Sequence, residues 1–199
     1  MPKLLYSPTS PYSAKVRMAA AHTGVACEAV RTDTNAEPAE LIDNNPLGKI
    51  PVWLTDDGEA IYDSVVIMRH IDRISGRALF PRAAERRIEA ERLESLADGI
   101  CDCLLAHVYE RRFRPEEKIH QPWLDTQMRK VARGLDWLNT NPPRMAAGLN
   151  GGHFALAACL GYHDLRFGAG WRNGRPKLDH WLDHFTAKFP AFAELKPQG

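Results

Sequence analysis

The chain has 199 residues, with 26 Lys and Arg against 25 Asp and Glu, and 44% of its residues are hydrophobic. This charge balance argues against a nucleic-acid-binding protein, which normally carries a basic excess. The hydrophobic content argues against a disordered chain. A chain of this length can bury a substantial core, as one large domain or two small ones.

No apolar run approaches the roughly 20 residues that cross a bilayer, so we expect no membrane partner. The start of the chain, Met1 to Pro8, is interrupted too soon by polar residues and proline to be a signal peptide. Free thiols in the reducing cytoplasm are therefore the expectation for the cysteines. They form neither a CxxC pair nor a zinc-ribbon spacing: Cys27, Cys101, Cys103 and Cys159.

The first half of the chain alternates short strand and helix patterns. Gly24 ends the first predicted helix, the turn residues 56–58 join two strands of a hairpin, and Asp63 opens the last helix of this half. In chain order, we expect a strand at 3–6, a helix at 12–23, a weak strand at 28–31, a short helix at 39–43, strands at 50–54 and 59–62, and a helix from 63 with apolar residues at 66, 67, 71 and 74.

The second half shows only helical periodicity. The apolar residues between Leu124 and Leu138 recur at steps of three and four. The largely apolar segment 154–167 is predicted to be the buried central helix. Further helices are predicted at 85–109 and 177–189. We therefore expect an α/β domain at residues 1–76, a linker at 77–84 and an all-α helical bundle at 85–199.

Three motifs follow one another in the first half: Ser10-Pro11-Tyr12-Ser13, Asn45-Pro46-Leu47-Gly48-Lys49-Ile50-Pro51-Val52 and Asp63-Ser64. The first looks like the Cys-Pro-Tyr-Cys of glutaredoxins with oxygen in place of both sulfurs. With the all-helical second half, the ordered set resembles the cytosolic glutathione S-transferases, in particular their serine-type bacterial and plant branches.

The resemblance covers essentially the whole chain and implies a thioredoxin-like βαβαββα domain that holds glutathione. It also implies that the helical domain supplies most of the pocket for an electrophile, and that the protein is a homodimer. Glutathione would be a co-substrate, and no metal is expected.

Ser10 is the candidate catalytic residue. Ser is a preferred helix N-cap, and Pro11 suits the first helical position. The Ser10 hydroxyl would lie at the positive end of the helix dipole, where an anion is stabilised and a glutathione thiol ionises more readily. Lys15 and Arg17 are expected to add positive potential there. Four neighbours are alternatives for the contact with the sulfur: Thr9, Ser13, Ser7 and, less favoured, Tyr6.

Ile50 and Pro51 form the second part of the predicted glutathione site. The resemblance implies a cis bond between them, which would turn the backbone of Ile50 outward to pair with the cysteinyl backbone of glutathione. The alternative is an ordinary strand start, at which proline is tolerated. Lys49 could meet the glycyl carboxylate of glutathione, or be a solvated surface residue.

Asp63 and Ser64 form the third part. The N–H groups and the Ser64 hydroxyl at a helix N-terminus suit the γ-glutamyl carboxylate, and Asp63 suits the ammonium. The alternative is a plain N-cap.

One position departs from the family pattern. Where the family shows Ser or Thr followed three residues later by Asp, this chain has Asn150 and His153. Asn150 remains a good N-cap. A neutral imidazole nitrogen of His153 could still accept the N–H that the carboxylate would accept.

Other polar pairs in the helical half are weaker signals. His180 and His184 have a spacing that can bind a metal, but no third ligand is evident. Asp98 or Asp102 could face the cleft between the domains. The basic cluster 110–115 is expected to be a solvated helix end.

The sequence therefore predicts a glutathione S-transferase that ionises the glutathione thiol beside Ser10 and adds it to a small hydrophobic electrophile. Two alternatives stay open. One is a glutathione-dependent isomerase, dehalogenase or peroxidase on the same fold. The other is a non-catalytic member that binds ligands or a partner, because fold does not settle function.

Overall fold

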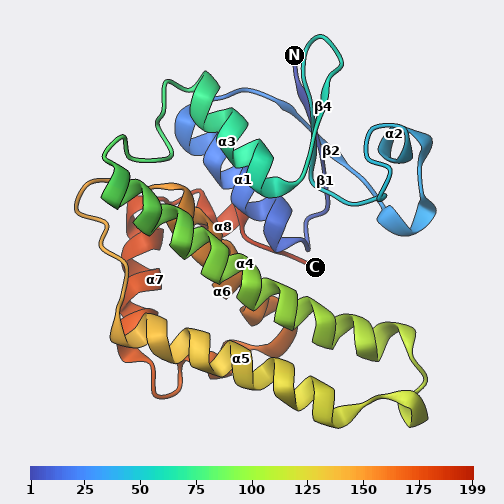
Figure 1. The fold of residues 1–199 in the computed structure, drawn as a ribbon, viewed down its shortest axis with the longest axis vertical. Helices are drawn as coiled ribbons and strands as arrows, with labels where there is room; N and C mark the ends of the chain where they lie inside the picture. Colours follow the sequence, from blue (N-terminus) through green and yellow to red (C-terminus); the bar gives the residue numbers. More distant parts are fainter.

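The computed structural model describes residues 1–199 (Figure 1). The first half of the chain has the predicted order of strands and helices. Its elements are β1 (Lys3–Tyr6), α1 (Pro11–Thr23), β2 (Glu28–Arg31), α2 (Ala39–Ile42), β3 (Val52–Leu54), β4 (Ala60–Ile61) and α3 (Ser64–Ile74).

The four strands form one mixed sheet in the order β2-β1-β3-β4, in which β1 pairs parallel to β2 and antiparallel to β3. Side chains of a strand alternate between the two faces. Leu4 and Trp53 accordingly belong to the main core, on the side of α1 and α3, whereas Leu5 and Val52 pack with Leu41 of α2 (Figure 1). This is a thioredoxin-like arrangement, with helices on both faces of the sheet.

The second half is entirely helical: α4 (Ala84–Phe113), α5 (Gln121–Thr140), α6 (Gly151–Phe167), α7 (Pro176–Lys188) and α8 (Phe192–Leu195). The segment predicted to be the central helix is buried from Gly151 to His163. The predicted apolar face of α7 is also confirmed, since all five of its residues are buried: Leu178, Trp181, Leu182, Phe185 and Phe189. None of the helices combines the length and the apolar character needed to cross a membrane.

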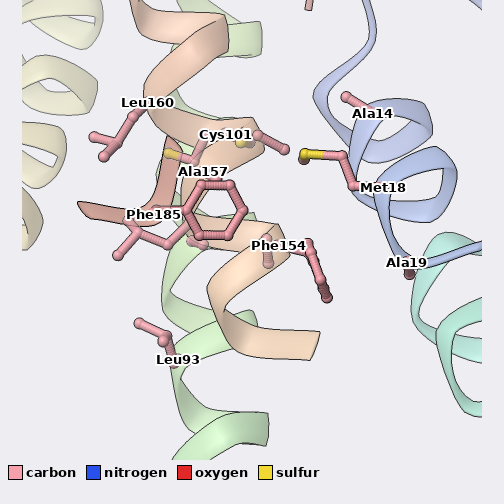
Figure 2. Packing of buried hydrophobic residues seen from close by; sticks show 14 of the residues in the cluster. Ala14, Met18, Ala19, Leu93, Cys101, Phe154, Ala157, Leu160 and Phe185 are labelled. Atoms are coloured by element: carbon pink, nitrogen blue, oxygen red, sulfur yellow. The ribbon is translucent and has the colours of Figure 1, made fainter. Parts of the chain in front are cut away.

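One hydrophobic core joins the two halves, because α6 packs against both α1 and α4. Figure 2 shows the Met18 side chain extending from α1 toward Cys101 of α4, and the same hydrophobic cluster contains Phe154 and Ala157 of α6. Gly152 permits a close approach of α6 to α4, since a Cβ at this position would lie 2.5 Å from the Ala90 carbonyl oxygen. The helical half is therefore held directly against the first helix of the sheet domain.

The structure differs from the sequence prediction in several places. α4 continues past Tyr109 to Phe113, and β3 and β4 are shorter than predicted. Val66 and Ile74 of α3 are exposed, because the face that meets the core is formed by Ile67, Met68 and Ile71. Short 3-10 turns, which carry weak local signals, were not predicted at Thr34–Ala36, Glu116–Lys118 and Ala169–Arg172.

His153 completes the cap of α6 in place of the family's carboxylate. Asn150 Oδ1 accepts the His153 N–H at 3.2 Å, and His153 Nδ1 accepts the Asn150 N–H at 3.1 Å. The second bond requires a neutral ring, as the sequence suggested. Burial lowers the pKa of His153 to about 4.

This cap predicts a loss of stability in mild acid. Between pH 6.5 and 4 the unfolded chain binds a proton on residue 153 that the folded chain does not, so the free energy of unfolding falls as the pH is lowered through this window. The expected loss is about 3 kcal/mol. His153→Gln keeps an acceptor at the N3 position without a titrating group. Urea unfolding at pH 7 and pH 4.5 should therefore show a smaller difference for this variant.

His184→Gln, at an exposed position of α7, is the matched control and should keep the wild-type difference. If the free energy of unfolding depends on pH equally in the wild type and in His153→Gln, the loss of stability in acid does not come from the His153 ring.

Candidate functional site

A cavity of about 1240 Å³ lies between the sheet domain and α4. Its lining residues come from the loops after β1 and β2, the segment before β3, the start of α3, one face of α4 and the end of α6. The structure brings together in this cavity all six residues predicted from the sequence: Ser10, Lys49, Ile50, Pro51, Asp63 and Ser64.

Ser10 caps α1. Its backbone is extended, and its Oγ accepts the Ser13 N–H at 3.2 Å, while Pro11 is the first helical residue. The hydroxyl proton has no acceptor in the protein, so Ser10 can cap the helix and still donate a hydrogen bond into the cavity. The chain end supports this loop, because the Gln198 N–H donates to the Pro8 carbonyl at 2.9 Å.

Two of the alternatives to Ser10 do not face the cavity. Ser13 is buried, and its Oγ accepts the Ser7 N–H at 3.4 Å. Tyr6 lies outside the lining, with the Arg17 guanidinium 4.6 Å from its ring centre. Ser7 and Thr9 do line the cavity, with their hydroxyl oxygens 3.2 Å apart. These two residues therefore remain alternatives to Ser10 for the contact with the sulfur.

The peptide bond between Ile50 and Pro51 is cis, as the resemblance implied. Buried Asn45 holds the loop in front of it: its Nδ2 donates to the Lys49 carbonyl at 2.8 Å, and its Oδ1 accepts the Leu47 N–H at 3.1 Å. Neither the N–H nor the C=O of Ile50 bonds to another protein group. The Ile50 backbone is therefore free to pair with a ligand, and the exposed Lys49 stands beside it.

Asp63 caps α3 by accepting the Val65 N–H at 3.0 Å, and buried Ser64 is the first helical residue. The bond between Tyr62 and Asp63 is cis. Because α1 also begins at the cavity, two helix N-termini with their free N–H groups open on one space. This arrangement favours the binding of an anion at each helix.

Lys15 does not contribute positive potential to the cavity, so this expectation was wrong. The Lys15 side chain is 1% exposed, and its Nζ lies 2.5 Å from Asp98 Oδ2 and 3.3 Å from Glu94 Oε1. Glu94 also pairs with Arg69 of α3 at 2.8 Å. Arg17 stacks on Tyr6 instead of facing Ser10. The face of α1 that carries Lys15 turns toward α4, which the local sequence does not specify.

Asp98 and Asp102 both line the cavity, whereas the sequence suggested only that one of them could. Burial raises the pKa of Asp98, although the Lys15 ammonium opposes this rise. The Tyr12 hydroxyl donates to Asp102, and the pKa of Tyr12 is raised by burial and by the nearby Cys101 and carboxylates. Tyr12 was not among the predicted site residues, although it belongs to the first motif.

The far end of the cavity was also missed by the sequence analysis. It is formed by residues of α4 and α6: Leu105, Tyr109, Arg112, Tyr162 and Arg166. The basic cluster 110–115 was expected to be a solvated helix end, but Arg112 lines the cavity. The four-residue spacing of Tyr162 and Arg166 could have indicated a shared helix face, but not that this face meets α4.

Comparison with known proteins identifies the fold. The family profile described as "Glutathione S-transferase, N-terminal domain" matches residues 4–78. A crystal structure of a glutathione S-transferase from Methylobacillus flagellatus with glutathione bound is 35% identical, with a TM-score of 0.91 over 100% of both chains. A glutathione transferase family member from Pseudomonas fluorescens, also with bound glutathione, is 33% identical, with a TM-score of 0.90 over 100% of both chains.

The fold is thus that of the glutathione S-transferases. The uncharacterized GST-like protein YibF of Escherichia coli is 30% identical to this chain over 98% of each protein. The chain belongs to the glutathione S-transferase family.

The buried ion pairs beside the cavity predict a large cost for removing Lys15. Lys15→Met would leave two carboxylates of α4 facing an apolar side chain, and truncating one partner of a buried pair costs roughly 3–5 kcal/mol. Urea unfolding should show a loss of this size. Lys3→Met is the matched control, since Lys3 pairs with Glu40 at the surface and such pairs contribute about 0–1 kcal/mol. Similar losses in the two variants would contradict this assignment.

Proposed function

We propose that this chain is a glutathione transferase of the serine type, which binds glutathione in the cavity and conjugates its thiolate to a small electrophile. The observation that carries the proposal is that the N-termini of α1 and α3 and the unpaired backbone of Ile50 open on the same cavity. Glutathione offers a carboxylate and an ammonium at one end, a peptide backbone in the middle and a thiol. The glutathione-bound relatives support the choice of ligand.

In the proposed complex, the γ-glutamyl end of glutathione binds at α3. The Ser64 hydroxyl and the first N–H groups of α3 receive the carboxylate, and Asp63 receives the ammonium. The free N–H and C=O of Ile50 form two backbone hydrogen bonds with the cysteinyl residue, as an added strand would. Lys49 would meet the glycyl carboxylate.

The thiol then lies at the start of α1. The dipole of α1 and a hydrogen bond from the Ser10 hydroxyl stabilise the thiolate over the thiol. The thiol proton leaves to solvent, and the thiolate attacks the electrophile. The protein contributes the ionised nucleophile and its position, and no metal takes part in this scheme.

The γ-glutamyl assignment predicts an effect of charge that can be separated from helix capping. Asp63→Asn keeps a side chain that caps α3 but removes the charge that would face the ammonium. Loss of a hydrogen bond between charged groups, roughly 1.5–3 kcal/mol, should weaken glutathione binding by at least about tenfold in calorimetry without a change in melting temperature.

Asp56→Asn is the control for this experiment, since Asp56 lies in the exposed hairpin turn outside the cavity and should bind glutathione like the wild type. Unchanged glutathione affinity in Asp63→Asn would show that the γ-glutamyl ammonium does not bind at Asp63.

The proposed function is tested by Ser10→Ala. The variant should raise the pKa of bound glutathione and lower the rate of conjugation to a reactive aryl halide at neutral pH by roughly 10–100-fold. Affinity for glutathione should change little, because most of the proposed contacts lie at Ile50 and at α3. The readout is the ultraviolet absorbance of the thiolate, titrated against pH with glutathione bound.

Thr9→Ala and Ser7→Ala are the comparison variants. A change in the thiolate titration that occurs only in one of them would move the role to that residue. If none of the three variants alters the titration, or if the wild type binds glutathione but conjugates no electrophile, the non-catalytic alternative is favoured.

A further inference from the structure

The face of α4 that lines the cavity changes its chemistry along the helix. Near α1 it carries carboxylates, of which Asp102 is the last, and it continues with Leu105, Tyr109 and Arg112. Steps of three and four residues keep these side chains on one helix face. At 1.5 Å per residue, Arg112 lies about 15 Å beyond Asp102 along the axis. The cavity therefore has an acidic part near α1 and an aromatic, cationic part farther away.

The acidic part is largely neutralised within the protein. Lys15 pairs with Glu94 and Asp98, Arg69 pairs with Glu94, and Tyr12 donates to Asp102. The two cations offset the charges of Glu94 and Asp98, whereas the hydrogen bond from Tyr12 leaves the charge of Asp102 in place. This part of the cavity therefore does not favour a second anion.

The arginines of the cationic part have no carboxylate partner. None of the ion pairs in the protein includes Arg112 or Arg166. The Nε of Arg166 is buried and donates to no protein group. The Arg166 guanidinium lies 5.8 Å from the ring centre of Tyr162, and that of Arg112 lies 5.7 Å from the ring centre of Tyr109.

A structural role at the end of α6 does not account for Arg166. A cation in the last helical turn is stabilised by the helix dipole, but this leaves the buried N–H without an acceptor, which is a costly arrangement. A carboxylate placed in the cavity could accept from that N–H, and the planar guanidinium matches a carboxylate with two parallel hydrogen bonds. Burial raises the pKa of Tyr162, and the guanidinium beside it opposes that rise, so the hydroxyl stays a neutral hydrogen-bonding group.

We propose that Arg166, assisted by Arg112, determines substrate specificity by binding a carboxylate on the electrophile. This inference rests on the proposed transferase function. The rings of Tyr109 and Tyr162 would contact the body of the substrate, with its reactive carbon toward Ser10. The favoured substrates are then aromatic or unsaturated electrophiles that carry a carboxylate.

A matched pair of substrates tests the proposal: a chlorodinitrobenzoate and the corresponding chlorodinitrobenzamide, which differ only in the charged group. In both, the thiolate sulfur bonds to the ring carbon that holds chlorine, and chloride leaves with the electron pair of the carbon–chlorine bond. No oxidant or reductant is involved. The wild type should prefer the benzoate, measured as the ratio of the two kcat/KM values after each is divided by the rate constant of the uncatalysed reaction with glutathione, because the amide activates the ring more than the carboxylate does.

Arg166→Gln should lower this ratio by roughly tenfold, the loss expected for one hydrogen bond between charged groups. Arg112→Gln should lower it by about threefold, because this side chain is exposed and its charge is screened. Arg114→Gln is the control, since Arg114 pairs with Glu110 outside the cavity lining, and it should leave the ratio unchanged. A wild type without preference, or an unchanged ratio in Arg166→Gln, overturns the proposal.

A binding measurement separates this inference from the transferase proposal. The glutathione conjugates of the two compounds are titrated into the wild type and the arginine variants by calorimetry. Tighter binding of the carboxylate conjugate, lost in Arg166→Gln, supports the inference even if the chain binds glutathione but turns over neither substrate. Equal affinities for the two conjugates overturn it. If Arg166→Gln does not fold, Arg166→Lys and Arg112→Gln decide. Both variants should lower the preference, because a lysine cannot form the two parallel hydrogen bonds of a guanidinium, and an unchanged preference in both overturns the proposal.

Discussion

The ion pair that buried Lys15 forms with Glu94 and Asp98 is the interaction on which the rest of the site depends. An unpaired ammonium in this position would cost several kcal/mol, so α1 and α4 must meet with these groups in register. The packing of α6 against both α1 and α4 sets the distance between the sheet domain and α4. The ion pair, with one distance of 2.5 Å, then requires the charged groups of α1 and α4 to face one another beside the cavity.

That fixed geometry gives the cavity two electrostatic ends. The free N–H groups of α1 and α3 favour anions beside Ser10 and Ser64, and the arginines favour an anion at the far end. An anionic electrophile would be repelled by a nearby thiolate in the low-dielectric cavity. Cations such as Arg166 offset that repulsion where the carboxylate lies. Under the functions proposed here, one end of the cavity therefore stabilises the thiolate and the other binds the carboxylate of the electrophile.

The sequence predicted the parts of the site that local interactions specify. Ser10 and Asp63 are caps whose preference for helix starts is intrinsic. The capping role of His153 was also foreseen as a possibility from the acceptor on its ring. The role of Lys15 was not foreseen. The sequence placed Lys15 in the first helix, but the group that its side chain meets depends on where α4 packs.

By itself, then, the sequence determined the order of the elements, the caps, the turns and the family motifs, since these depend on residues within a few positions of one another. Only the tertiary structure decided that Tyr12 meets Asp102, that Lys15 is buried and that Arg112 and Arg166 face a common cavity. Each of these contacts joins helices far apart in the chain. Their geometry is set by the packing of α6 against α1 and α4, which depends on complementary shapes across the whole core.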